Sequence, residues 1–378
     1  MKPIKILWLT AADEKAFGHT ELFGITKSLI DAGHDVTVVV ASKQKQERNG
    51  NLQYLKNPFS RMLFFKVKLA LYAARWAIST KPDFIIVDWQ SAFVPIILLV
   101  LSKSGLYENN LIHDLRTVPV PTNSSHGQRI FDLCLQISKR YYLGLTTITS
   151  ALKDKLYSEY KIPPEKIGVW SSGVDLNLFY PRDGSVMRQK LGVGGKFVIF
   201  YHGSIGYRRG VVELVEAISL LNKKYDDIAL IILGSGSDLA TVRKIKNEQK
   251  LNNVVIHPPV DYETVPEYIA TSDLCVVPLP DLECWRVSSP LKLMEYLAMG
   301  KPVVLTDIPA HREIVKTKEE AIFIPDIQPE TLCGAIEKAY HMRKNLHVLG
   351  SAGLRNAREN CSWDIQADRL VKFLATLQ

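Results

Sequence analysis

Short apolar runs alternate with longer amphipathic stretches along the first half of the chain. The runs have the length and composition of buried strands, and they lie at 5–10, 36–41, 84–88, 110–114, 145–149 and 166–169. Stretches with helical spacing separate them, at 21–32, 93–101, 128–143 and 151–160. Because strands that alternate with helices build parallel sheets, the pattern predicts an α/β domain over residues 1–181.

The same alternation begins again after a polar, glycine-rich segment at 182–195, which we interpret as the domain boundary. Further apolar runs lie at 197–201, 229–233, 254–257, 274–278 and 303–305, and a closing amphipathic helix is predicted at 360–374. The length of 378 residues fits two domains. We therefore expect two doubly wound parallel-sheet domains, 1–181 and 182–360, followed by a C-terminal segment, 361–378.

The most informative stretch reads RVSSPLKLMEYLAMGKPVVLT, at 286–306. Ser289 is a favoured helix cap with a proline after it, and Gly300 ends the predicted helix before a strand. Glu295 lies on the apolar face of this helix, where a carboxylate needs a partner or a ligand. Two interpretations stay open: Glu295 pairs with Lys292 on the surface, or it accepts hydrogen bonds from the hydroxyls of a ribose.

Several loops that follow predicted strands are rich in glycine. HGSIGYRRG, at 202–210, places Gly203 and two arginines before a helix, a combination that suits phosphate; an exposed basic turn is the alternative. Gly18 precedes the first helix, where it could approach a phosphate or form a simple turn. Gly234 begins a similar loop in the second half. Neither the GxGxxG fingerprint of NAD enzymes nor a Walker motif is found in these loops.

His113 stands at the end of the strand predicted at 110–114. The carboxyl end of a parallel strand faces the ligand crevice of such a sheet. An imidazole there could transfer a proton or bind a sugar hydroxyl. A buried structural histidine is the alternative interpretation.

The formal net charge of +8 comes from one segment. Residues 43–82 contain nine basic residues and one acidic residue, interleaved with aromatic and aliphatic side chains. This composition suits an anionic membrane surface, while a helix that covers the sheet with a solvated basic face is the alternative. Nucleic acid is not expected as a partner, because no known binding motif accompanies the charge.

The remaining composition favours a cytoplasmic protein. If residues 43–82 bind lipid, the protein would associate peripherally with the inner face of the cell membrane. The five cysteines include no CxxC pair, which argues against a zinc site and for a reducing compartment. The N-terminus does not read as a signal peptide, and the longest apolar run, 93–101, is too short to span a bilayer.

Taken together, these motifs resemble the retaining GT-B glycosyltransferases of family 4, in a subgroup with the pattern SPxKLxEYxAxGxPVV. The resemblance covers nearly the whole chain and rests on the Gly18 loop, GHDVTVVV (33–40), His113-Asp114, SSGVD (171–175), HGSIGYRRG (202–210), LGSGSDL (233–239) and SPLKLMEYLAMGKPVV (289–304). It implies two Rossmann-like domains that face a central cleft. It also implies that a last helix, beginning near Trp363, crosses back to the first domain.

The resemblance implies a role for each matching residue. Glu295 corresponds to the carboxylate that binds the donor ribose, and Arg209 to the cation that holds the diphosphate. His113 corresponds to a histidine near the reaction centre, so these three residues are the expected catalytic group. The other expected donor-binding residues are Gly18, His19, Gly203, Arg208, Gly234, Val260, Ser289, Leu291 and Lys292.

Three positions depart from the family pattern. Val287 stands where a glutamate is common, Ser204 where a basic residue often follows the glycine, and His19 where a second glycine is common. The change at Val287 affects the expected contact with the donor sugar, which Glu283 could make instead. Members of the subgroup that this chain resembles also lack that glutamate.

The function implied by the resemblance is transfer of a sugar, with retention and without a metal, from a nucleotide-diphosphate sugar to a glycan or lipid-linked acceptor. The expected setting is synthesis of cell-envelope polysaccharide or glycolipid, with no cofactor besides the donor. An alternative is a non-catalytic GT-B subunit that binds a partner transferase or a sugar nucleotide, which Val287 and Ser204 favour. A nucleotide-sugar epimerase is disfavoured by the SPLKLMEY stretch.

Overall fold

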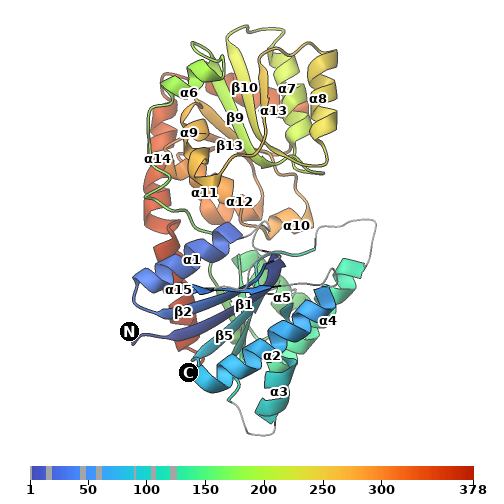
Figure 1. The fold of residues 1–378 in the computed structure, drawn as a ribbon. Helices are drawn as coiled ribbons and strands as arrows, with labels where there is room; N and C mark the ends of the chain where they lie inside the picture. The colour runs from blue at the N-terminus through green and yellow to red at the C-terminus, as the bar shows by residue number, and fades with distance from the viewer. Residues whose placement is uncertain are drawn as a thin grey trace. The chain divides into compact units, whose positions relative to one another are not determined.

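The computed structural model describes residues 2–13, 19–42, 48–56, 62–88, 91–103, 108–119 and 126–378. Contacts within the chain divide it into two compact units, Met1–Gly173 with Trp363–Gln378, and Val174–Ser362 (Figure 1). The division falls at 173/174 and 362/363, eight and two residues from the boundaries expected at 181/182 and 360/361.

The described strands of the first unit form a sheet in the order β3-β4-β2-β1-β5-β6-β7-β8. They are β1 (Lys5–Asp13), β2 (Asp35–Ser42), β3 (Arg48–Asn49), β4 (Leu52–Lys56), β5 (Phe84–Asp88), β6 (Leu111–Leu115), β7 (Gly144–Thr147) and β8 (Ile167–Val169). Neighbouring strands are parallel except β3 and β4, which are antiparallel. Sequence analysis did not predict β3 and β4, which lie in the basic segment. The strand order reverses direction between β1 and β5, which marks a topological switch point.

Helices cover both faces of this sheet. They are α1 (His19–Asp31), α2 (Met62–Thr80), α3 (Ile96–Lys103), α4 (His126–Tyr141), α5 (Ser150–Tyr160) and α15 (Trp363–Ala375). One core joins α2 and α3 to the sheet through buried side chains such as Leu69, Ala73 and Leu98. On the other side of the sheet α1 packs against α15 (Figure 1).

The last helix fits the first unit because small residues let it come close. A Cβ atom on Gly24 of α1 would lie 2.3 Å from the Trp363 ring, and one on Gly168 of β8 would lie 2.3 Å from the Phe373 ring. Larger side chains at these two glycines would therefore displace α15. The expected return of the C-terminal helix to the first domain agrees with this packing.

The second unit has a six-stranded parallel sheet in the order β11-β10-β9-β12-β13-β14. The strands are β9 (Phe197–Ser204), β10 (Ile228–Ser235), β11 (Val254–His257), β12 (Leu274–Val277), β13 (Val303–Thr306) and β14 (Ile322–Ile324). In order along the chain this is the arrangement 3-2-1-4-5-6 of dinucleotide-binding folds. Its switch point lies between β9 and β12, so ligands are expected where these strands end.

The helices of the second unit also form two layers. They are α6 (Ser185–Lys190), α7 (Val211–Leu221), α8 (Leu239–Glu248), α9 (Val265–Ala270), α10 (Glu283–Arg286), α11 (Leu291–Ala298), α12 (Pro309–Ile314), α13 (Pro329–His341) and α14 (Leu346–Asn360). The main core joins α7 and α13 to one face of the sheet. The helices α11 and α14 pack against each other, and α11 contacts β12 and β13. In the part of the chain that the structure describes, no helix is both long and apolar enough to cross a membrane.

Candidate functional site

Glu295 is the most deeply buried carboxylate of the second unit's candidate site, with 2% of its surface exposed. Its Oε2 lies 2.8 Å from Nε2 of His202, and the hydroxyl of Tyr262 donates to its Oε1 over 2.9 Å. The interpretation of Glu295 as a surface residue paired with Lys292 is therefore wrong. The carboxylate is held from two sides by residues of β9 and of the turn before α9, which fixes its orientation.

The bonds around His202 hold its ring between Tyr296 and Glu295. Its backbone N–H donates to the hydroxyl oxygen of Tyr296 over 3.0 Å, and Nδ1 lies 2.9 Å from the same oxygen. One arrangement satisfies every group: the Tyr296 O–H donates to Nδ1, and Nε2–H donates to Glu295. The imidazole thus links two adjacent residues of α11. Sequence analysis included His202 in a phosphate loop but missed this link, and it missed Tyr262 and Tyr296 altogether.

Lys292 is the second unusual side chain on α11. It is 9% exposed, and its Nζ has no hydrogen-bond partner among the described residues. The ammonium group lies 3.8 Å from the centroid of the Tyr201 ring, a favourable cation–π distance. Burial, and then the positive charge of Arg209, hold the pKa of Lys292 well below its usual value, against the opposing effect of Glu295. A buried donor without an acceptor favours an anionic ligand.

The glycine-rich loop between β9 and α7 carries the two arginines. Arg208 has a φ of 57° and Gly210, directly before α7, has a φ of 72°. Trp285 of α10 supports the loop, because its indole N–H donates to the Arg208 carbonyl over 2.9 Å and the Arg209 guanidinium lies 4.6 Å from a Trp285 ring. The alternative of an exposed basic turn fits Arg208, which is exposed, but not Arg209, which is partly buried.

The other expected donor-binding residues of the second unit lie at the ends of neighbouring strands. Gly203 and Gly234 are partners in the register of β9 and β10. A Cβ atom on Gly234 would lie 1.9 Å from the Gly203 carbonyl oxygen, so this position needs glycine. Val260 follows β11 and is partly buried.

The start of α11 differs from the prediction. Pro290, not Ser289, is the cap residue, with φ −73° and ψ 109°, and Leu291 begins the helix. The predicted Ser289 cap is wrong because the extended proline shifts the first turn by one residue. Ser289 and Val287 are both buried, whereas Glu283 is exposed at the start of α10.

His113 lies within β6 and is completely buried. Its Nδ1 is 2.6 Å from the hydroxyl oxygen of Ser138 on α4, and Nε2 has no hydrogen-bond partner among the described residues. Burial lowers the pKa of His113 to about 3. These surroundings favour the alternative interpretation, a buried neutral histidine, over a group presented to a ligand.

Two expected donor-binding residues of the first unit cannot be placed at the site. Gly18 lies outside the described residues, and His19 begins α1 with a side chain that is also outside them. Within the described residues, no group of three His, Cys, Asp or Glu side chains is arranged to hold a metal ion.

A polar cluster near the start of α1 was not predicted. Glu21 accepts hydrogen bonds from Arg116 over 3.2 Å and from the Ser172 hydroxyl over 2.6 Å. The Arg116 guanidinium lies 3.5 Å from a Trp170 ring and donates to the Trp170 carbonyl over 2.7 Å. The cluster ties α1 to the segments after β6 and β8. The SSGVD motif was the available signal, but it did not identify the partners.

Solved structures of other proteins share the fold of this chain. Anabaena Alr3699/HepE, in complex with UDP and glucose, has a TM-score of 0.78 at 16% identity, over 98% of this chain and 99% of that one. Sucrose-phosphate synthase (tll1590) from Thermosynechococcus elongatus has a TM-score of 0.75 at 18% identity, over 97% of each chain. The protein therefore has the GT-B fold, as the sequence predicted.

The family follows from the sequence matches. "Glycosyltransferase Family 4" matches residues 22–178, and "Glycosyl transferases group 1" matches residues 185–355. The chain is also 28% identical over 237 residues to a D-inositol 3-phosphate glycosyltransferase of Jonesia denitrificans, over 58% of this chain and 54% of that one. It spans about half the length of the curated relatives it matches first. Together the two matches cover most of the chain and identify it as a glycosyltransferase with a family 4 domain followed by a group 1 domain.

Proposed function

We propose that this protein is a retaining glycosyltransferase that moves a sugar from a nucleotide-diphosphate sugar to a glycan or lipid-linked acceptor. The observation that carries the proposal is that α11 presents two buried charged side chains side by side. Glu295 is a carboxylate held in a fixed orientation, and Lys292 is a cation that lacks an acceptor among the described residues. Ribose hydroxyls would donate to Glu295, and the diphosphate would accept from Lys292 and from Arg209. Both contacts lie where ligands bind in a sheet of this order.

The chemistry follows from the charge that develops when the donor bond breaks. The leaving diphosphate gains negative charge, which the cations Lys292, Arg208 and Arg209 stabilise most strongly where water is excluded. The acceptor hydroxyl attacks the face of the sugar from which the diphosphate departs, so the anomeric configuration is retained. The cations take the role that a metal ion has in other transferases, and activity should persist in EDTA. The proposed setting is synthesis of cell-envelope polysaccharide or glycolipid.

A thermal-shift screen of nucleotide sugars is the first test, because a ligand that binds only the folded protein raises its melting temperature. The best donor is then offered to candidate acceptors, and the product's anomeric proton is assigned by NMR. Glu295→Ala should abolish the shift and the transfer. Donor binding without hydrolysis or transfer to any acceptor would favour the non-catalytic subunit, and an inverted product would refute retention.

We also propose that the basic segment of the first unit contacts an anionic membrane. Val67, Leu71 and Ile78 of α2 are 53%, 58% and 58% exposed, and their spacing places them on one side of the helix. Exposed Arg75 lies in the same stretch. The opposite side of α2 covers the sheet, as the alternative interpretation expected. Residues 43–47 and 57–61 of the segment lie outside the described residues.

Sedimentation with vesicles tests this surface. Wild-type protein should bind vesicles that contain anionic lipid and should bind neutral vesicles less. Leu71→Asp/Ile78→Asp should release it, whereas Val186→Asp/Val348→Asp, at exposed positions of the second unit, should not. Equal binding by both variants would refute the assignment to α2.

A further inference from the structure

A pocket of about 510 Å³ lies at the amino-terminal edge of the second unit's sheet. Phe197 begins β9, Asp273 directly precedes β12, and Pro302 directly precedes β13, and all three line the pocket. The pocket is thus at the opposite end of the strands from the loops that carry Gly203 and Arg209. It is separate from the proposed donor site.

The lining of this pocket is strongly basic. It contains five lysine and arginine residues against two aspartates, and His347 adds a further imidazole. The basic residues are Arg188, Lys196, Lys301, Arg343 and Lys344. The excess of positive charge in a concave site raises the local concentration of anions.

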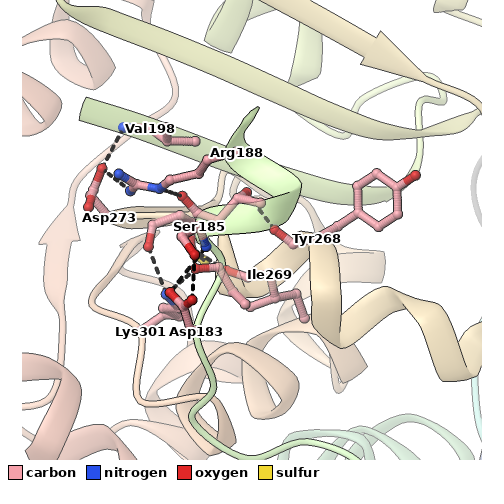
Figure 2. Close-up of polar contacts among 12 residues, drawn as sticks. Asp183, Ser185, Arg188, Val198, Tyr268, Ile269, Asp273 and Lys301 are labelled. Carbon is pink, nitrogen blue, oxygen red and sulfur yellow. Dashed lines mark hydrogen bonds and ion pairs between the residues drawn. The ribbon is translucent and has the colours of Figure 1, made fainter. Parts of the chain in front are cut away.

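Two of the cations are fixed in the floor. Arg188 pairs with Asp273 over 2.6 Å, and the same aspartate accepts the Val198 backbone N–H over 2.8 Å (Figure 2). Lys301 donates to the carbonyl oxygens of Ala270 and Ser272 over 2.9 Å and 2.8 Å. These contacts hold Arg188 and Lys301 in place. Arg188 and Asp273 offset each other's charge, so the positive charge of the pocket comes from the other cations.

The cations of the rim lack acidic partners. Among the described residues, Lys196, Arg343 and Lys344 have no carboxylate oxygen within 4.0 Å. The Arg343 guanidinium lies 4.4 Å from the ring of Tyr340, whose hydroxyl donates to Asp227 over 2.7 Å. Like charges that converge without a counter-charge repel each other, and an anion bound among them removes that repulsion.

We propose that this pocket binds a small phosphate-bearing molecule, such as a sugar phosphate or a nucleoside phosphate. Its volume lies in the range of roughly 300–1,000 Å³ that is usual for small-molecule sites. Lysine and arginine side chains form the strong charge-assisted hydrogen bonds that phosphate requires. Phe197, Pro302 and Leu346 add apolar surface for the organic part of the ligand.

Hydrogen–deuterium exchange with inorganic pyrophosphate locates the site. Full-length Arg208→Ala/Arg209→Ala protein serves as the background, because it weakens binding at the proposed donor site. Pyrophosphate should protect peptides that cover 195–198 and 342–348. Adding Lys196→Ala, Arg343→Ala and Lys344→Ala should remove that protection and lower the affinity of this site for pyrophosphate roughly tenfold or more.

A charge-conserving variant controls for folding. Lys196→Arg/Arg343→Lys/Lys344→Arg in the same background should retain the protection, and all variants should keep the parent's melting temperature because the three positions are at the rim. Protection that survives the alanine substitutions, or no protection of 195–198 and 342–348 at millimolar pyrophosphate, would overturn the proposal. Either result leaves the donor-site proposal untouched, because that site is tested by Glu295→Ala.

Discussion

Replacing His202 tests whether the orientation of Glu295 matters for nucleotide binding. In His202→Ala, the Glu295 carboxylate loses the donor on Nε2, which lies 2.8 Å from Oε2, and keeps the hydrogen bond from the Tyr262 hydroxyl to Oε1. The Tyr296 hydroxyl loses its acceptor at the same time. Glu295 can then rotate about one remaining anchor, so the ribose hydroxyls meet an acceptor that is no longer held in place.

The size of the effect follows from the hydrogen bond between the ribose and Glu295, which is no longer held in its favourable geometry. A hydrogen bond to a charged acceptor contributes about 1.5–3 kcal/mol, and each 1.4 kcal/mol corresponds to about tenfold in affinity. Nucleotide affinity should therefore fall about tenfold or more. Because the loss concerns ribose, the preference for a ribonucleotide over its 2′-deoxy analogue should fall with it.

Isothermal titration calorimetry with the nucleoside diphosphate of the best donor, and with its 2′-deoxy form, measures both quantities. His202→Gln is the matched control, because its amide N–H can replace Nε2–H, whereas His202→Asn is too short to do so. The glutamine variant should keep most of the ribose preference and the asparagine variant should lose it. Wild-type affinity and wild-type preference in a folded His202→Ala protein would refute the reasoning.

Three further predictions concern strain and buried charge. Arg208→Gly should be about 1 kcal/mol more stable than Arg208→Ala by urea midpoint, because a φ of 57° strains alanine but not glycine; equal midpoints would contradict this. Lys292→Met should keep or raise the melting temperature while weakening diphosphate binding, because it removes a buried cation without an acceptor; unchanged binding would contradict its role. Burial lowers the pKa of His113 to about 3 and of His311 to about 4, from 6.5. The unfolded chain therefore binds more protons below pH 6.5, and stability should fall from there towards pH 4, less steeply in His113→Gln; identical pH profiles would contradict the assignment.

The pattern of apolar runs was sufficient to predict the fold, because each central strand of both sheets is a short run of buried residues. The strands β3 and β4 were missed because they are short and lie among charged residues, where no apolar run marks them. The start of α11 was misplaced because capping preferences describe residue types, whereas the actual start depends on the extended backbone of Pro290. Local pattern gives the elements, and the backbone angles of single residues set their ends.

The sequence singled out Glu295 but gave no indication of its contacts. Glu295 stood out because a carboxylate on an apolar face requires an explanation. Its partners could not be found, since His202 and Tyr262 lie 93 and 33 residues away in sequence. His113 was placed at a strand end from the sequence, but side-chain direction in a strand alternates, and this histidine is buried against α4.

The two buried charged residues of α11 have different partners. Lys292 and Glu295 are three residues apart, a spacing at which opposite charges on a helix ordinarily pair. Here Glu295 is held by His202 and Tyr262, and Lys292 lies against the Tyr201 ring. The cation consequently lacks an acceptor, and the attraction of Glu295 offsets only part of the free-energy cost of burying it. An anionic ligand would supply the missing acceptor, so the same arrangement that lowers the pKa of Lys292 favours a diphosphate over a neutral molecule.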